Sequence, residues 1–379
     1  MIIKKISVRN FRNIDRAELS FGTGTTVFHG KNAEGKTNLL EAMYLPVTGR
    51  AFRTKHDASL IKYGEDFCDV TSEWEISGRK NTVSVRYLRE NGAVQRAVAV
   101  NGVRITKLSE LFGRFRAVLF SPGDLSLVTG GPGERRRFLD MAISSVDGAY
   151  LRKLQHYGKV LDQRNAMLRE AQKKLRESRR APDASVLAPW NELLAEDAAF
   201  ISKKRAEYCV HLSETVDKTV SDMTHGKEGA GVRCRAGREK DEFLKQLGEN
   251  PEAEVRAGMT LYGVHRDDLT LELNGRDGRE FGSQGQQRTL ALAMRISEGE
   301  IIYEKTGDRP VFLLDDLLIA LDDDRRRFLL DSFDGKQVFV TSCENVGVGK
   351  NEALGELIRR GAEIIRVSGG AFEKTDTDI

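Results

Sequence analysis

The sequence predicts a mixed α/β protein in which a long helical segment interrupts a sheet domain. Three observations support this prediction. A β-branched and aromatic stretch, TTVF at 25–28, runs into a glycine-rich loop and then into a helical pattern, TNLLEAMY at 37–44. A second apolar run at 311–314 reads as a buried strand. Between these strands, residues from about 135 to 225 show the leucine spacing of long helices.

Length and composition indicate a soluble, globular chain of two domains. Its 379 residues exceed one ordinary core, and we expect a discontinuous sheet domain at 1–120 and 258–379, with a helical domain at 121–257. Hydrophobic content is 40% and charged content 31%, and no window approaches the length of a membrane span. The opening MIIKKISVRNF does not read as a signal peptide. Four cysteines without CxxC spacing make zinc and a disulfide framework improbable and favour a reducing, cytoplasmic location.

The glycine-rich loop fits the pattern GxxxxGK[ST]. Strand, loop and helix follow one another as a phosphate-binding loop requires, with backbone N–H groups and the helix dipole favouring an anion. Lys36 would reach the β- and γ-phosphates, and the Thr37 hydroxyl would ligate Mg²⁺. A chance match in a turn is the alternative. The loop consists of Gly30, Lys31, Asn32, Ala33, Glu34, Gly35, Lys36 and Thr37.

A second half-site for the metal follows the apolar run at 311–314. Asp315 would hold Mg²⁺ directly or through water, and Asp316 is placed to orient or deprotonate an attacking water. An acidic turn after a core strand is the alternative interpretation. Together the two motifs predict a nucleoside triphosphate site, which a kinase, a GTPase or a switch ATPase could each use.

A third segment, Gly282 to Gln287, is small and polar and opens a helix expected from about Arg288. Such a helix N-terminus suits an anion. One nucleotide does not need two such sites from one chain, whereas a dimer does, because the second loop can meet the γ-phosphate bound by the other subunit. An ordinary helix cap on Ser283 is the alternative.

With these motifs, the chain resembles the RecF family of bacterial recombination-mediator ATPases, which have an ABC-type head like that of SMC proteins. The resemblance covers nearly the whole chain, with its segments in the expected order. The segments that carry it are IIKKISVRNFRNIDRAELSF, GKNAEGKTNLLEAMYL, AFRTKHDASLIKYGED, VLFSPGDLSLVTGGPGERRRFLD, YGKVLDQRN, GVHRDDL and SQGQQRTLALAMR.

The resemblance implies roles for matching positions. The loop from Gly30 to Thr37 would bind ATP, with Lys36 and Asp316 catalytic. Asp315 and Asp316 would be the Walker B pair. Asp322 would sit in a D-loop at a dimer seam, and residues 120–124 would form a Q-loop. A signature motif acting on the other subunit would comprise Ser283, Gln284, Gly285 and Gln286.

The chain also departs from the family pattern. The D-loop reads Ile319-Ala320-Leu321-Asp322 where SELD is usual, Gly123 replaces a common acid, and no switch histidine follows KQVFVTSC. Asp316 is one methylene shorter than the glutamate common in ABC proteins. These departures favour slow hydrolysis, with ATP acting as a timer for a clamp.

The helical insert predicts an antiparallel hairpin. Leu154, Leu161, Leu168 and Leu175 recur every seven residues, and Leu194, Ile201 and Tyr208 do the same in a second segment, with two prolines in RRAPDASVLAP between them. Two helices of about 25 residues would give an arm of roughly 37 Å. Simple core leucines are the alternative.

Basic clusters on or near the insert are candidates for DNA phosphate contacts, and a solvated helix face is the alternative for each. Scarce aromatic residues disfavour a dedicated single-strand binder. The candidates are Arg135, Arg136, Arg137, Arg179, Arg180, Lys203 and Lys204. The stretch His265-Arg266-Asp267-Asp268 lacks further ligands for zinc, and we expect a turn near the nucleotide or the lobe interface.

The function expected from these features and the resemblance is that of a DNA clamp. ATP and Mg²⁺ would drive homodimerisation on double-stranded DNA or single-strand/double-strand junctions, and weak, DNA-stimulated hydrolysis would release it. The resemblance adds gap repair, replication restart and the SOS response to DNA damage, with RecR and RecO as partners in loading RecA and no membrane partner. A small-molecule phosphotransferase and a nucleotide-binding scaffold with little turnover are the alternatives.

Overall fold

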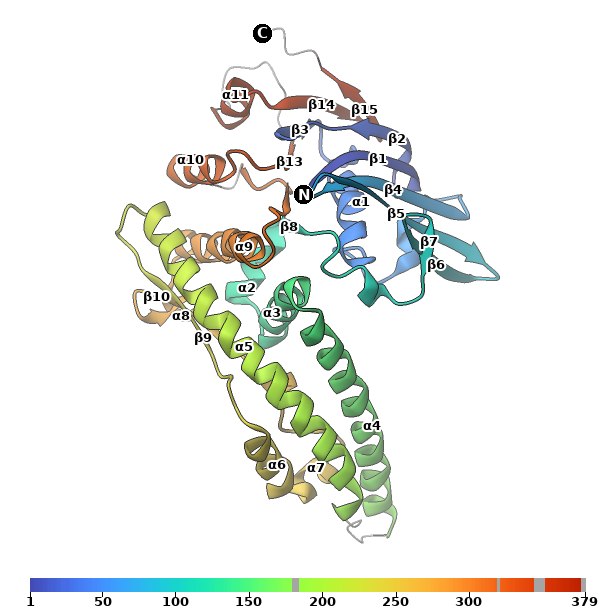
Figure 1. Ribbon diagram of the computed structural model, residues 1–379, viewed down its shortest axis with the longest axis vertical. Coiled ribbons are helices and arrows are strands. Elements are labelled where there is room, and N and C mark those ends of the chain that lie inside the picture. The colour runs from blue at the N-terminus through green and yellow to red at the C-terminus, as the bar shows by residue number, and fades with distance from the viewer. Residues whose placement is uncertain (179–183, 319–320, 344–351, 376–379) are drawn as a thin grey trace. The chain divides into compact units, whose positions relative to one another are not determined.

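The computed structural model describes residues 1–178, 184–318, 321–343 and 352–375 (Figure 1). The chain divides into two compact units, and each is described by itself. Unit 1 comprises 1–124, 223–225 and 292–379, and unit 2 comprises 125–222 and 226–291.

Unit 1 is built on two six-stranded sheets. In the first, with the order β2-β1-β4-β5-β6-β7, all neighbours are antiparallel. In the second, with the order β15-β14-β3-β13-β12-β8, all pairs are parallel except β14 with β15. The strands are β1 (Ile2–Phe11), β2 (Ile14–Ser20), β3 (Thr25–His29), β4 (Phe67–Ile76), β5 (Arg79–Glu90), β6 (Ala93–Val100), β7 (Val103–Ile105), β8 (Ala117–Phe120), β12 (Val311–Leu314), β13 (Val338–Ser342), β14 (Glu363–Ser368) and β15 (Ala371–Lys374).

The predicted strands at 25–28 and 311–314 are confirmed as β3 and β12, and only β13 separates them. Because the three strands are parallel, their carboxyl ends meet at one edge of the sheet. The two phosphate-site motifs follow these ends directly, so the topology brings them together.

Two-residue turns set the register of the antiparallel sheet. Ser77-Gly78, Asn91-Gly92 and Asn101-Gly102 each have positive φ at both residues. This is the turn whose twist matches that of paired strands, and asparagine and glycine tolerate it best. The chain therefore folds back tightly at each turn, and β4 to β7 form a continuous meander.

Helix α1 (Lys36–Thr48) is the core of unit 1. It contacts β1, β4 and β5 of the antiparallel sheet and β8 and β13 of the parallel sheet. Leu39, Leu40 and Met43 are fully buried, and so are Ala42 and Leu45 on other faces. A helix covered from two sides is apolar nearly all round, which explains its weak amphipathic pattern. The other helices of this unit are α10 (Asp323–Ser332), α11 (Glu352–Arg359), η1 (Asp57–Leu60) and η2 (Leu108–Glu110), with η3 (Pro122–Leu125) at its boundary.

Unit 2 is mainly helical, and its hairpin is confirmed as antiparallel. Lys153 contacts Asp197, and Arg164 further along the first helix contacts Asn191, earlier in the second. The elements are α2 (Ser126–Thr129), α3 (Pro132–Val146), α4 (Gly148–Ser178), η4 (Ala184–Leu187), α5 (Ala188–Met223), α6 (Lys240–Glu249), α7 (Pro251–Ala257), η5 (Val264–Arg266) and α8 (Gly278–Phe281), with strands β9 (Ala230–Cys234), β10 (Leu269–Leu273) and β11 (Arg276–Asp277). Helix α9 (Gln284–Thr306) begins in unit 2 and continues into unit 1.

The hairpin helices are longer than predicted, at 31 residues for α4 and 36 for α5. At 1.5 Å per residue they measure about 47 and 54 Å. Of the α4 leucines only Leu168 is fully buried. The buried face follows Tyr157, Val160 and Arg164 instead, because other elements besides α5 cover this helix. None of the described helices is both long and apolar enough to cross a membrane.

Residues 258–291 were expected in the sheet domain, but the division of the chain places them in unit 2. The reason is strand pairing. β10 lies between β9 and β11 in a three-stranded antiparallel sheet, with Leu271 opposite Val232. A strand bonded on both sides belongs with its sheet partners, so the return to unit 1 occurs within α9.

Candidate functional site

The predicted phosphate-binding loop, residues 30–37, follows β3 and leads into α1. Lys36 is buried, and its ammonium group donates to the carbonyl oxygens of Gly30 and Lys31, both at 2.8 Å. The loop passes close to neighbouring backbone, because a Cβ added at Gly30 would lie 2.2 Å from the Val367 oxygen. Gly35 has φ of 114°, which only glycine adopts without strain. The loop therefore has the compact shape and the enclosed lysine of a phosphate cradle.

Thr37 and Asp315 meet in space although 278 positions separate them in sequence. The Thr37 hydroxyl donates to Asp315 Oδ1 at 2.7 Å, and the Thr341 hydroxyl donates to the same oxygen at 3.0 Å. A hydroxyl and a carboxylate in contact beside a phosphate loop are the donor set that suits Mg²⁺. The residues present thus fit the metal that the motifs imply.

Asp316 has the features of a catalytic carboxylate. Its φ of 47° lies in the left-handed region, a strained conformation for a residue other than glycine. Its N–H donates to the Thr341 hydroxyl at 2.8 Å. Its Oδ1 is buried and has no hydrogen-bond partner within the described residues. Burial and then the charge of Asp315 raise the pKa of Asp316, while Lys36 opposes the shift. A carboxylate oxygen without a hydrogen-bond partner, on a group whose pKa is raised, suits a general base.

The structure adds polar residues beside the loop that the motif did not identify. Glu41, fully buried on α1, accepts from Arg12 Nε at 2.6 Å and from Arg53 Nη2 at 3.0 Å. Asn13 accepts from Asn38 at 2.7 Å. These contacts brace the first turns of α1 against the β1–β2 turn. The available signal was Glu41 itself, a charged residue that lies in the sequence between the apolar pairs Leu39-Leu40 and Ala42-Met43.

The segment expected to be a Q-loop ends on a partly buried ion pair. Asp124 Oδ1 accepts from Arg295 Nε at 3.0 Å and from Nη2 at 2.8 Å. Arg295 also donates to Glu298 at 2.8 Å. Burial opposes the charge of Arg295, but Asp124 and Glu298 outweigh it and raise its pKa. Although Gly123 replaces the acid common in the family, the neighbouring Asp124 still supplies a carboxylate to this segment.

The predicted signature segment lies at the start of α9, which begins at Gln284 rather than at about Arg288. The earlier start follows from a reciprocal cap: the Gln286 N–H donates to the Ser283 hydroxyl at 3.3 Å, and the Ser283 N–H donates to the Gln286 side chain at 2.9 Å. Gln286 also donates to Glu228 at 2.7 Å. Ser283 and Gln284 are exposed, so both the expected cap and an exposed helix N-terminus are present.

Of the expected D-loop, Ile319 and Ala320 lie outside the described residues. Leu321 is buried, and Asp322 caps α10 by accepting from the Arg325 N–H at 3.0 Å. Asp322 is half exposed, with 51% of its side chain accessible, which leaves it available to a partner.

The basic candidates for DNA contact separate into different environments. The prediction for Arg135 is wrong, because its side chain is only 6% exposed and its guanidinium donates to both oxygens of Asp268 at 2.8 and 2.9 Å. Arg136 is half-buried and donates to the Asp267 carbonyl at 2.7 Å, and Lys204 bonds to Glu207 at 3.0 Å. Arg137 and Lys203 are exposed. Arg179 and Arg180 lie outside the described residues.

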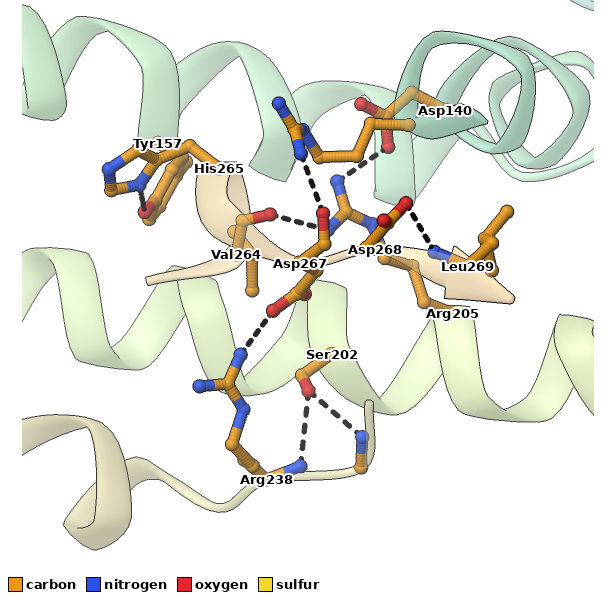
Figure 2. Close-up of polar contacts among 12 residues, drawn as sticks. Asp140, Tyr157, Ser202, Arg205, Arg238, Val264, His265, Asp267, Asp268 and Leu269 are labelled. Atoms are coloured by element: carbon orange, nitrogen blue, oxygen red, sulfur yellow. Dashed lines mark hydrogen bonds and ion pairs between the residues drawn. The ribbon is translucent and has the colours of Figure 1, made fainter. Parts of the chain in front are cut away.

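The stretch at 265–268 is the centre of a buried polar network inside unit 2, shown in Figure 2. Asp267 accepts from Arg205 at 2.9 Å and also from Arg238, and Arg205 donates to Asp140 at 2.8 Å. Burial raises the pKa of Asp267, although both arginines oppose the shift. No group of three or more potential metal ligands occurs in the described part of the chain. The network therefore joins α3, α5 and the turn that precedes β10, a structural role that the sequence did not reveal.

His265 of the same stretch is held as a neutral ring. The Tyr157 hydroxyl lies 2.6 Å from Nδ1, and the Thr260 carbonyl lies 3.2 Å from Nε2. A tyrosine donor on Nδ1 and a carbonyl acceptor at Nε2 fit one neutral tautomer. Burial lowers the pKa of His265 to about 4, so the ring stays uncharged near neutral pH.

Comparisons with known proteins agree with this geometry. The model of the RecF/RecN/SMC N-terminal domain matches residues 2–364. The DNA replication and repair protein RecF of Agathobacter rectalis is 36% identical over 342 residues, which cover 90% of this chain and 92% of the relative. The protein of the same name from Bacillus subtilis is 34% identical and spans 99% of this chain and 100% of its own length.

Solved structures show the same architecture. The recombination mediator protein RecF with ATP, from the RecFOR pathway, matches with a TM-score of 0.87 at 31% identity, covering 98% of this chain and 97% of that one. An SMC head from Pyrococcus furiosus, at 17% identity and a TM-score of 0.55 over 98% of this chain and 95% of that one, shares the fold alone. The predicted fold class, an ABC-type ATPase head with a helical second domain, is confirmed. This chain belongs to the RecF family, within the proteins that share the RecF/RecN/SMC N-terminal domain.

Proposed function

We propose that this chain is an ATP-gated clamp on double-stranded DNA that acts in recombinational repair and replication restart. The observation that carries the proposal is the contact between Thr37 and Asp315 at 2.7 Å beside the buried Lys36. It brings together, from distant segments, both halves of the proposed nucleotide–metal site. Relatives named as DNA replication and repair proteins, and a related RecF solved with ATP, support the ligand and the process.

The nucleotide chemistry follows from the loop. The Lys36 ammonium now bonds to two carbonyl oxygens of its own loop, and the β- and γ-phosphates of ATP are stronger acceptors for it. Magnesium, when bound, neutralises phosphate charge beside Thr37 and Asp315. Asp316 accepts the proton of the attacking water. Because Asp316 is shorter than a glutamate, we expect a weak ATPase. We propose, by analogy with the family, that DNA stimulates it.

The predicted signature segment is the part of the chain that would make dimerisation depend on ATP. Ser283 and Gln284 are exposed at a capped helix N-terminus, which favours an anion. We infer that this end of α9 meets the γ-phosphate held by a second copy of the chain. ATP then favours the closed dimer because it contacts both copies there, and hydrolysis removes that preference.

Duplex DNA is the proposed ligand, and exposed arginine and lysine side chains are its proposed contacts. Arg137 and Lys203 remain candidates after Arg135 is assigned to a buried ion pair. Phosphate contacts by arginine and lysine hold a duplex without reading its sequence. Single-strand/double-strand junctions, RecR and RecO as partners, and delivery of RecA to gaps complete the proposal by analogy with the family.

The experiment that tests the gate is light scattering at fixed protein concentration with no nucleotide, with ADP and with ATP, each with magnesium. We expect a dimer only with ATP. Ser283→Arg places a cation and bulk at the proposed seam, so it should bind ATP yet stay monomeric. Gln163→Arg, at an exposed position of α4, is the matched control and should dimerise. A Ser283→Arg protein that dimerises as wild type does contradicts the cross-subunit assignment.

A nucleotide-binding scaffold with little turnover is the second candidate. The D-loop favours it, because residues 319–322 lack the serine and glutamate of the usual SELD pattern. Phosphate release from saturating ATP with duplex DNA separates the two. Turnover that disappears in Lys36→Ala supports the clamp. ATP-dependent dimerisation without measurable turnover supports the scaffold.

A further inference from the structure

Two of the four cysteines lie against each other in unit 2. Cys209 on α5 is 4% exposed, and Cys234, the last residue of β9, is half-buried. Their thiols are within hydrogen-bonding reach of each other, and both are free. Twenty-four residues separate them in sequence, at 210–233, so only the fold brings them together.

A ladder of side-chain contacts sets this register. The Ala230 N–H donates to Asp217 on α5 at 2.8 Å, and the Val232 N–H donates to Ser213 at 2.9 Å. Two residues of strand advance about 6.6 Å, and four residues of helix advance about 6 Å. The next step therefore sets Cys234 opposite Cys209. The ladder continues beyond it, where the Gly237 N–H donates to the Ser202 hydroxyl at 2.9 Å.

The surroundings make the two thiols unequal. The hydrogen bond from Cys209 lowers the pKa of Cys234; burial and Asp267 oppose this shift, and Arg205 and Arg238 add to it. The pKa of Cys209 is raised, first by its bond to Cys234 and then by burial. Cys234 is therefore the better nucleophile, and Cys209 is the protonated neighbour placed to react second.

We propose that Cys234 and Cys209 form an oxidation site for peroxides, closing to a disulfide that joins α5 to β9. The Cys234 thiolate attacks one oxygen of hydrogen peroxide, the O–O bond breaks, and Cys234 becomes a sulfenic acid as hydroxide leaves. Cys209 sulfur then attacks Cys234 sulfur, and the S–O bond breaks. Water leaves with the Cys209 proton. Overall two thiols lose two electrons and two protons, and one peroxide yields two waters.

The contacts between β9 and α5 hold the two cysteines' backbones close together. A disulfide needs its two Cβ atoms about 3.5–4.5 Å apart. The backbone of β9 already lies within hydrogen-bond reach of short side chains on α5 at two neighbouring rungs of the ladder. Both residues belong to unit 2, so bond formation needs no rearrangement of other parts of the chain.

The remaining cysteines provide matched controls. Cys68 is fully buried in unit 1, and burial raises its pKa to about 12, so it should stay unreactive. Cys343, also in unit 1, is half-buried like Cys234. Unlike Cys234, it has no known cysteine neighbour among the described residues, and the next cysteine in the sequence, Cys234, lies more than 100 residues away. Reaction at Cys234 and Cys209 before Cys343 would thus reflect the pairing and not exposure alone.

The test uses the full-length, fully reduced chain. It is treated with graded hydrogen peroxide, its remaining thiols are blocked with N-ethylmaleimide, and the digest is analysed by mass spectrometry. We expect a linked peptide joining Cys209 to Cys234, two hydrogens lighter than the reduced pair and abolished by dithiothreitol. In Cys209→Ser, Cys234 should instead accumulate as a sulfenic acid that dimedone traps. In Cys234→Ser, Cys209 should remain a thiol.

The wild-type digest alone can overturn the proposal, whatever the variants do. If Cys209 and Cys234 are both recovered as N-ethylmaleimide adducts at a peroxide concentration that already oxidises Cys343, the pair is not an oxidation site. A linked peptide that joins either cysteine to Cys343 or to a second copy of the chain has the same meaning. At least a ten-fold lower peroxide requirement for the pair than for Cys343 is the expected result.

Discussion

The buried ion pair between Arg164 and Glu254 gives the sharpest test of what holds unit 2 together. Both side chains are fully buried, one on α4 and the other on α7. Arg164 also donates to Asn191 and to the Thr260 hydroxyl, each at 2.8 Å. Replacing Arg164 with methionine keeps most of the side-chain volume and removes every one of these donors.

The expected loss of stability follows from the contacts that Glu254 keeps once Arg164 is replaced. In Arg164→Met, the Glu254 carboxylate keeps one bond, from the Leu261 N–H at 2.9 Å, and has no other ion-pair partner among the residues that the structure describes. An unpaired buried charge of this kind destabilises a protein by about 3–5 kcal/mol. At about 1.4 kcal/mol per factor of ten, the unfolding equilibrium of unit 2 should shift roughly a thousand-fold.

The assay is urea denaturation read by hydrogen-exchange mass spectrometry, which follows peptides of unit 1 and unit 2 in the same sample. Peptides from α4 and α7 should lose protection at lower urea, while peptides from α1 keep their midpoint. Arg169→Met, at an exposed position on the same helix, should change stability by less than about 0.5 kcal/mol.

A double variant, Arg164→Met with Glu254→Leu, separates charge from packing. Removing both charges should recover most of the lost stability, because apolar replacements of buried ion pairs are often neutral. A loss below about 1 kcal/mol in the single variant would refute this account. So would a double variant that is less stable than either single one.

Three further predictions concern catalysis, pH and salt. Asp316→Asn should lower ATP turnover at least about a hundred-fold and prolong the ATP-dependent dimer, measured by phosphate release and light scattering; wild-type turnover in this variant would remove Asp316 from the mechanism. Because burial lowers the pKa of His265 to about 4, the unfolded chain binds the extra proton between that value and 6.5. Stability should therefore fall by about 2 kcal/mol from pH 7 to pH 5, and a His265→Gln variant that falls by the same amount would contradict the assignment. Duplex affinity should decline linearly with the logarithm of salt concentration, and Arg137→Gln with Lys203→Gln should make the slope shallower by about 2, whereas an unchanged slope would exclude both residues from the groove.

The phosphate loop was predictable from sequence because its parts are contiguous. Strand, glycines, Lys36 and Thr37 lie within one short stretch, and each has a local signature. Strand β12 was predictable for the same reason, since its four apolar residues run directly into Asp315 and Asp316, the proposed Walker B pair. Their meeting across 278 positions followed from the rule that parallel strands end at a common edge.

The roles of charged residues were less predictable. Arg135, Arg136 and Arg137 are adjacent and look alike in the sequence. The structure buries the first against Asp268, half-buries the second and exposes the third. A helix turns about 100° per residue, so neighbours in sequence face different surroundings, and which surroundings they meet depends on elements far along the chain.

The sequence by itself therefore determined the fold class, the nucleotide loop, its carboxylate partners and the antiparallel hairpin, all of which depend on local periodicity or contiguous motifs. Only the tertiary structure decided the network around Asp267, the neutral state of His265 and the contact of Cys209 with Cys234. Each of these joins segments that are distant in sequence and share no common pattern. The physical reason is that burial, which sets charge pairing, pKa and thiol reactivity, is a property of the packed chain and not of any stretch within it.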